Sequence, residues 1–168
     1  MNLYYREMIQ KIDLGEEKNR LAKVKFLPPE VPVAQDAKPA VSAEERVLDQ
    51  GDNSFYQGRY AEAKAAYQSV LEKLNATSER ALYGVAVVAA NTRKPNLAET
   101  YFKKTLEAGR DLRIATWCHI YLGRLYDLGG KRAEALAQYR AASLTASGFP
   151  EAQHAVERAL QKPFGSEP

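Results

Sequence analysis

The chain has 168 residues, 45% of them hydrophobic and 27% charged, a composition typical of a globular domain with a modest apolar core. Its 24 Lys and Arg residues are nearly balanced by 21 Asp and Glu residues, and a net charge of +3 gives no indication of nucleic-acid binding. The longest nearly apolar run, residues 81–90, is about half of the ~20 residues that a membrane span needs, so no span is expected.

Residues 1–41 are predicted to be an N-terminal tail or linker, because they hold four of the eight prolines and match no repeat. A short helix is expected before Gly15, and the prolines favour an extended segment over residues 26–33. Glu7 stands where a secretory signal would begin its apolar core, and the single cysteine fits a reducing compartment. A cytoplasmic location is therefore expected.

From Ser42 onward, residues that start and end helices recur regularly. Ser42 and Glu45 have the spacing of a capping box, and Gly58 is suited to the left-handed position after a helix. Asn96 with Glu99 has capping spacing for a later helix. Asp111 is a further N-cap candidate. The predicted helices span 43–56, 60–74, 79–91, 97–108, 112–128, 132–145 and 151–161.

One short pattern occurs three times within these helices. Gly58-Arg59-Tyr60-Ala61-Glu62-Ala63 leads to Tyr67, and Gly130-Lys131-Arg132-Ala133-Glu134-Ala135 leads to Tyr139. The middle copy keeps Leu97-Ala98-Glu99 and Phe102. The anchors Ala63, Ala98 and Ala135 lie 35 and 37 residues apart, a period typical of stacked helical units that bury their apolar faces against one another.

These residues make the chain resemble tetratricopeptide repeat proteins, with three repeats and a C-terminal capping helix. Small residues match the family in the first helices (Gly51, Gly84 and Gly123), and a small residue with an aromatic matches it in the second helices (Ala63/Tyr67, Ala98/Phe102 and Ala135/Tyr139). The resemblance implies an all-α, right-handed superhelical solenoid of antiparallel helix pairs over residues 42–162. Residues 163–168 are then a short C-terminal tail.

The middle unit departs from this pattern in its spacing. Gly84 and Ala98 are 14 residues apart, whereas the corresponding residues are 12 apart in the other two units. We therefore expect a turn around Thr92–Pro95 that is two residues longer than the others. A longer junction is also expected near Gly109.

In this family the first helices line a concave groove that takes a peptide, and the resemblance implies the same here. The positions that map to the groove are Leu48, Asp52, Phe55, Tyr56, Val85, Val88, Trp117, Ile120, Arg124 and Asp127, of which Trp117, Tyr56, Asp52 and Arg124 are the strongest candidates. Trp117 could equally be buried, and only one of the neighbours Phe55 and Tyr56 is expected to face the groove. The residues that bind chaperone C-termini in one branch of the family are missing.

The expected function is therefore a non-catalytic protein-interaction module that binds a peptide or partner segment, with no metal or cofactor. Cys118 and His119 are adjacent on a helix, so their side chains diverge and do not form a nucleophile–base pair. The alternative is an accessory docking or oligomerisation domain of a larger enzyme or secretion assembly. The extended segment 26–33 could cover the first repeat, or enter the groove of its own chain or of a neighbouring copy as a homo-oligomer.

Overall fold

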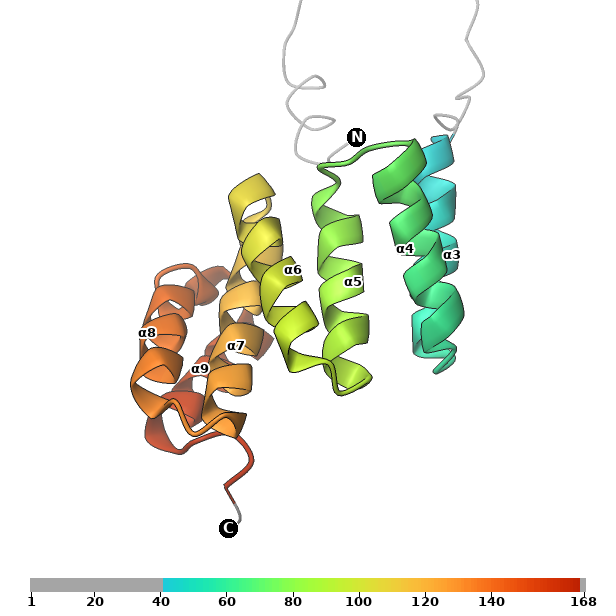
Figure 1. The fold of residues 1–168 in the computed structure, drawn as a ribbon. Coiled ribbons are helices and arrows are strands. Elements are labelled where there is room, and N and C mark those ends of the chain that lie inside the picture. The colour runs from blue at the N-terminus through green and yellow to red at the C-terminus, as the bar shows by residue number, and fades with distance from the viewer. Residues whose placement is uncertain (1–40, 167–168) are drawn as a thin grey trace, which may run out of the picture. The chain divides into compact units, whose positions relative to one another are not determined.

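A computed structural model of the chain describes residues 41–166, so the predictions for residues 1–40 lie outside the described range. Within it the structure is all α-helical, without strands, and the helices follow one another side by side (Figure 1). They are α3 (Ala43–Tyr56), α4 (Tyr60–Lys73), α5 (Glu79–Asn91), α6 (Pro95–Ala108), α7 (Leu112–Leu128), α8 (Arg132–Ser143) and α9 (Pro150–Gln161), with a short 3-10 helix, η1 (Ala146–Gly148), before α9.

The predicted helix boundaries agree closely with these elements. Both ends of α3, α5 and α7 are confirmed, and α4 ends one residue early. Helix α6 begins at Pro95, because proline fits the first turn of a helix, so Asn96 lies inside α6 and its predicted capping role is wrong. Helix α8 ends at Ser143, two residues early, because η1 begins soon after it.

Side-chain caps hold two of the helix starts as predicted. The Ser42 hydroxyl accepts a 3.0 Å hydrogen bond from the backbone N–H of Glu45 at the start of α3. The Asp111 carboxylate accepts from the N–H groups of Arg113 and Ile114, at 2.7 and 3.3 Å, at the start of α7. Each bond satisfies a backbone donor that has no partner inside the helix.

The three turns that close the helix pairs have the same length, which corrects the expectation of a longer middle turn. Each consists of three residues, 57–59, 92–94 and 129–131, and the middle residue has a positive φ: 73° at Gly58, 56° at Arg93 and 71° at Gly130. In every turn the backbone N–H of the third residue donates a hydrogen bond to the carbonyl five residues earlier, as Lys94 does to Ala89 at 2.9 Å. This pattern is the Schellman motif.

The junction between α6 and α7 is also shorter than expected. It spans residues 109–111, whereas the junction between α4 and α5 spans residues 74–78. The additional residues lie inside α7, which has 17 residues and is the longest helix of the described range.

Within each pair, a buried aromatic ring of the second helix fills the space beside small residues. Tyr67, Phe102 and Tyr139 are almost fully buried, next to Ala63, Ala98 and Ala135, which have no exposed surface. The Tyr67 ring lies against Gly51 of its own pair, and the Tyr139 ring lies against Gly123. A side chain at either glycine would overlap the ring, which explains the preference for small residues there.

Gly84 plays a different part from the one that its alignment with Gly51 and Gly123 predicts. It faces Tyr67 of the preceding pair, since a Cβ at Gly84 would lie 2.7 Å from two atoms of that ring. Ala86 is fully buried in one cluster with Ala98 and Phe102 and is the small residue of the middle pair. The register of α5 is therefore two residues away from the predicted one.

The first helices of successive pairs lie next to one another. Helix α3 contacts α5 and α5 contacts α7, whereas no comparable contact joins α4 to α6 or α6 to α8. Helix α9 packs against α7 and α8 and covers the last pair with a small-residue face that includes Ala152, Ala155 and Val156. This arrangement places α3, α5 and α7 in one row.

Candidate functional site

A groove runs along the row of first helices. Its volume is about 430 Å³, and we call it the first-helix groove. It is lined by Asp52, Phe55 and Tyr56 of α3, Tyr67 of α4, Arg80, Tyr83, Gly84 and Val87 of α5, and Ile114 and Tyr121 of α7. A volume of this size is within the range of ligand-binding clefts.

The wall of the first-helix groove is mainly aromatic. The rings of Phe55 and Tyr56 meet edge to face with centroids 5.9 Å apart, and those of Tyr83 and Tyr121 do so at 6.4 Å. Burial raises the pKa of Tyr83 well above its ordinary value, so this phenol stays neutral. Tyr56 is 85% exposed and is available to a partner without any rearrangement.

One end of the groove carries a polar cluster that joins the first two helix pairs. Arg80 of α5 bonds to Asp49 at 2.7 Å and to Asp52 at 2.5 Å, both on α3. The Tyr67 hydroxyl donates a 2.6 Å hydrogen bond to Asp52, and burial followed by this bond raises the pKa of Tyr67. Two carboxylates therefore share a single guanidinium, which leaves this cluster of three side chains with one negative charge in excess.

Three of the predicted groove residues line the first-helix groove: Asp52, Phe55 and Tyr56. Phe55 and Tyr56 both do so, although only one of them was expected to face it. Four others are core residues, with exposed fractions of 5% for Leu48, 1% for Val85, 2% for Val88 and 0% for Ile120, and this is a correction. The error at Val85 and Val88 follows from the register of α5, because two helical residues correspond to a rotation of about 200°.

The remaining three predicted residues are on α7 and do not line the groove. Trp117 is half-buried, packs against the cluster that contains Ile120, and has its ring 6.0 Å from that of Tyr121. Arg124 stacks on Tyr121 with its guanidinium 5.3 Å from the ring centre. The Asp127 carboxylate is fully buried and pairs with Arg132 at 3.0 Å, so it serves the fold and not the groove.

Sequence reasoning missed Arg80, Tyr83, Val87, Ile114 and Tyr121 as groove residues. For the three residues on α5 a signal existed. Counting back 12 residues from Ala98, the spacing of the other units, gives Ala86 as the small residue, and this choice turns Arg80, Tyr83 and Val87 toward the groove. Alanine fits a close helix crossing nearly as well as glycine, so the presence of Gly84 two residues earlier was misleading.

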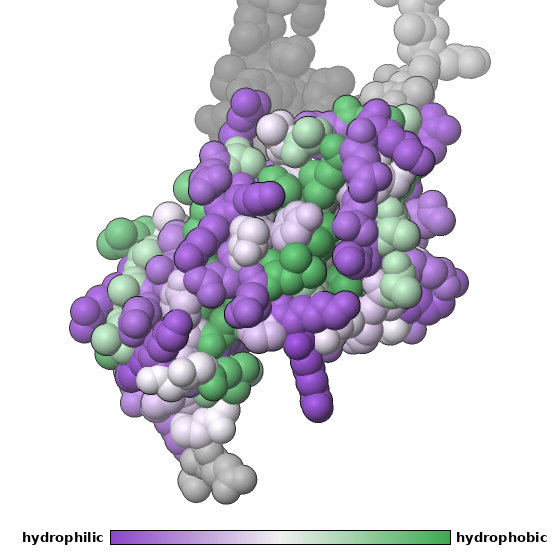
Figure 2. All heavy atoms as spheres, in the orientation of Figure 1, coloured by the Kyte–Doolittle hydropathy of each residue, from purple (hydrophilic) through white to green (hydrophobic). Residues whose placement is uncertain are grey.

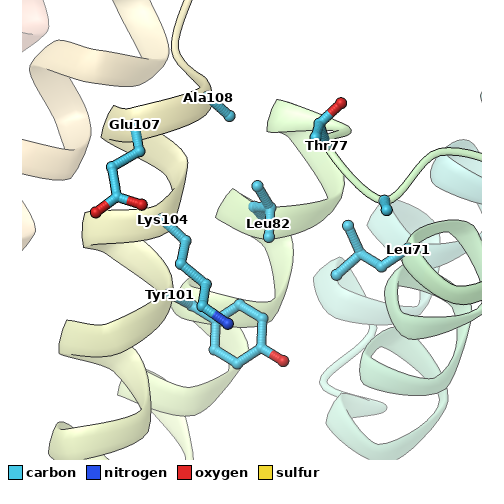
Figure 3. Close-up of a pocket in the computed structure, with 8 residues that line it drawn as sticks. Leu71, Thr77, Leu82, Tyr101, Lys104, Glu107 and Ala108 are labelled. Carbon is cyan, nitrogen blue, oxygen red and sulfur yellow. The ribbon is translucent and has the colours of Figure 1, made fainter.

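A second groove lies between the second helices α4 and α6. Its volume is about 470 Å³, and its lining includes Leu71 of α4, Leu82 of α5, and Tyr101 and Lys104 of α6 (Figure 3). The Lys104 ammonium lies 5.4 Å from the centre of the Tyr101 ring. Apolar residues gather on this face between α4 and α6 (Figure 2). This groove contacts only the first two helix pairs, whereas the first-helix groove extends over all three.

Cys118 and His119 of α7 do not form a nucleophile–base pair. Cys118 has no exposed surface, and burial raises the pKa of its thiol to about 12, so the thiol stays protonated at neutral pH. His119 Nδ1 lies 2.8 Å from Gln138 Oε1 and is not directed at the thiol. Between residues 41 and 166 no group of three His, Cys, Asp or Glu side chains is arranged to hold a metal ion.

No protein-family model matches the sequence, and a search of curated proteins finds no relative. No helix in the described part of the chain is both long and apolar enough to cross a membrane. The class that the fold defines is therefore an all-helical protein whose helices pack in neighbouring pairs, an architecture compatible with a helical repeat.

Proposed function

We propose that the chain is a tetratricopeptide-type interaction module that binds a segment of a partner protein in the first-helix groove and has no catalytic activity of its own. The observation that carries this proposal is that one groove collects side chains from α3, α5 and α7, the first helix of every pair. Groove residues contributed by every unit of an array are the usual basis of binding in stacked-repeat proteins.

The repeat pattern supports the finer assignment to the tetratricopeptide class. Small residues and aromatics recur every 35 to 37 residues, and the three turns have identical hydrogen bonding. A right-handed superhelix is the expected form of such an array and is part of the proposal.

The side chains of the groove define the kind of segment that it would bind. Phe55, Tyr56, Tyr83 and Tyr121 offer aromatic surface, and Val87 adds an aliphatic side chain. Aromatic residues of this kind provide large contact areas at little cost in side-chain entropy. We therefore expect a segment with at least one apolar or aromatic anchor, which stacks on these rings.

A binding experiment with matched surface variants tests the proposal. The chain is used to capture proteins from a lysate of its source, in parallel with a Tyr56→Ala, Tyr121→Ala double variant and with Leu144→Ala. Tyr56 and Leu144 are 85% and 83% exposed, but Leu144 lines none of the grooves described above, so Leu144→Ala controls for the loss of an exposed apolar side chain. Circular dichroism checks that each variant keeps its helix content.

A partner retained by Leu144→Ala and lost by the groove variant would support the proposal. Equal capture by all three proteins would contradict it and move the interface elsewhere. Analytical sedimentation of the chain at several concentrations tests the alternative function, a docking or oligomerisation domain, because it detects self-association. Self-association that is lost in the groove variant would assign the groove to contacts between copies of the chain.

A further inference from the structure

A small basic pocket continues the first-helix groove at its α7 end. Its volume is about 230 Å³, and it lies between α7, α9 and the segment that follows α9. The lining residues are Arg124, Ala155, Arg158, Ala159, Lys162, Pro163, Phe164 and Gly165, which include three cationic side chains and no acidic one. Arg124 joins this pocket to the groove, because its guanidinium stacks on Tyr121, a residue of the groove wall.

The pocket is held in place by a buried carboxylate. Asp127, whose side chain has no exposed surface, accepts hydrogen bonds from the Tyr139 hydroxyl at 2.9 Å and from the backbone N–H of Phe164 at 2.8 Å. The second bond fixes the chain after α9 against α7. As a result, the Phe164 ring lies 5.0 Å from the Arg124 guanidinium.

Arg124 therefore contacts two aromatic rings, those of Tyr121 and Phe164. Stacking fixes the plane of a guanidinium but leaves the N–H donors at its edge available for an oxygen ligand. Neither Arg124 nor Arg158 forms an ion pair with a carboxylate of the described residues, and the nearby Asp127 is already paired with Arg132. Among residues 41–166, Arg124 and Arg158 thus have no carboxylate partner.

The opposite end of the first-helix groove has the opposite charge. There Asp49 and Asp52 share Arg80, which leaves one negative charge in excess. The groove is thus electrostatically asymmetric along its length, and complementary charges on a partner would favour one direction of binding.

We infer that the basic pocket binds a carboxylate side chain of the partner segment and so sets the direction in which the segment lies in the groove. This inference rests on the proposed function of the groove. The ligand is an Asp or Glu of a protein segment whose apolar anchor occupies the aromatic part of the groove. Arg124, which contacts both rings, supplies the directional hydrogen bonds, and Arg158 adds charge.

The test uses a library of random 12-residue peptides displayed on phage and selected against the intact chain. The same selection is made with an Arg124→Gln, Arg158→Gln variant and with a Lys73→Gln, Arg140→Gln control, which loses the same charge from exposed positions on second helices. One acidic peptide from the first selection is then synthesised with Glu or with Gln at the enriched position, and the affinity of both forms is measured for all three proteins.

The expected result is enrichment of Asp and Glu at one position with the intact chain and with the control, but not with the Arg124→Gln, Arg158→Gln variant. The Glu-to-Gln change should weaken binding about tenfold to the intact chain and leave binding to that variant unchanged. Such coupling identifies the two arginines as the partner of the carboxylate.

Two other results would contradict the inference. One of them would also contradict the proposed function of the groove, and the other would not. If the selected peptides compete with one another for the groove but show no preference for Asp or Glu, the basic pocket is not a carboxylate site. The proposed function of the groove would still hold. A failure of the intact chain to select any peptide would remove both proposals.

Discussion

The Tyr67 ring of α4 lies flat against the backbone of Gly84 on α5, so close that a Cβ at position 84 would be 2.7 Å from the ring. Because the same ring also lies against Gly51 of α3, it is enclosed by glycines from two successive helix pairs. The contact sets the distance between these pairs. Tyr67 and Gly84 also line the first-helix groove.

This contact predicts that Gly84→Ala destabilises the chain even though alanine favours helix formation. Tyr67 has 3% exposed surface and little room to move, so we expect a loss of about 1–3 kcal/mol in the free energy of unfolding. Urea denaturation followed by circular dichroism measures it. The control is Gly148→Ala, where an added Cβ meets no atom within 4 Å. Equal stability of Gly84→Ala and the parent chain would refute the argument.

The turn at Arg93 predicts a stabilising substitution. Arg93 has a φ of 56°, in the left-handed region, where the equivalent turns carry glycine. A side chain there costs about 1–2 kcal/mol, and the greater freedom of glycine in the unfolded chain offsets about 0.5–1 kcal/mol of that. Arg93→Gly should therefore raise the midpoint of thermal unfolding, by an amount that corresponds to roughly 0.5–1 kcal/mol.

The reciprocal substitution provides the control for this turn. Gly58→Ala introduces the same backbone strain at a φ of 73°, in a place where the added methyl group touches nothing. It should lower the midpoint of unfolding by a comparable amount. If both substitutions moved the midpoint in the same direction, backbone strain would not be the cause.

The two aspartates bonded by buried tyrosines should differ in their importance for stability. Asp127 has no exposed side-chain surface and accepts bonds from Arg132 and Tyr139. Asp127→Asn should lower the free energy of unfolding by about 2–3 kcal/mol, because it leaves the Arg132 guanidinium without its carboxylate. Asp52 is 35% exposed, so water screens its charge, and Asp52→Asn should cost less than about 1 kcal/mol.

Chemical denaturation of the two variants, side by side at pH 7, checks this difference. A larger loss for Asp52→Asn than for Asp127→Asn would show that burial is not the deciding factor. Release of the chain that follows α9 in Asp127→Asn can be followed separately through the NMR signals of Phe164.

Burial of Cys118 predicts a loss of stability in alkaline solution. The pKa of its thiol rises from 9.0 to about 12 in the folded chain, because burial disfavours the thiolate. Between these pH values the unfolded chain releases a proton that the folded chain keeps, so the free energy of unfolding falls as the pH rises. Tyr67, Tyr83 and Tyr139 have raised pKa values for the same main reason and act in the same direction at higher pH.

Urea titrations between pH 7 and pH 11 measure this effect. The parent chain should lose stability steadily above pH 8, and Cys118→Ala should show a smaller slope between pH 8 and pH 9, where an unfolded cysteine titrates and a tyrosine hardly does. Cys118 should also react with a thiol reagent far more slowly in the folded chain than in urea. Identical slopes for the two proteins would contradict the assignment to Cys118.

The helices could be predicted well from the sequence because their ends are set by local chemistry. Ser42, Asp111 and Pro150 start helices, and Gly58 and Gly130 end them, through bonds and backbone angles that involve only a few neighbouring residues. Arg93 gives no such signal, because an arginine in the left-handed region is held there by the surrounding turn and not by its own preference.

The groove was harder to predict because it depends on the rotation of each helix about its axis. On α3, where Gly51 was correctly taken as the small residue, Asp52, Phe55 and Tyr56 line the groove, although Leu48 is buried and only one of the two aromatic residues was expected there. On α5, the choice of Gly84 in place of Ala86 turned the predicted face into the core. The basic pocket depends on contacts between α7, α9 and the residues after α9, which no local pattern encodes.

The row formed by α3, α5 and α7 has a consequence for how the chain would respond to a ligand. Each helix pair contacts its immediate neighbours in the array, so we expect the outer pairs to open while the middle pair, with eight buried residues in α5, remains folded. A segment lying across all three first helices would have to release before either end could open. Binding would then couple the unfolding of the three helix pairs, so that the array unfolds in a single cooperative step.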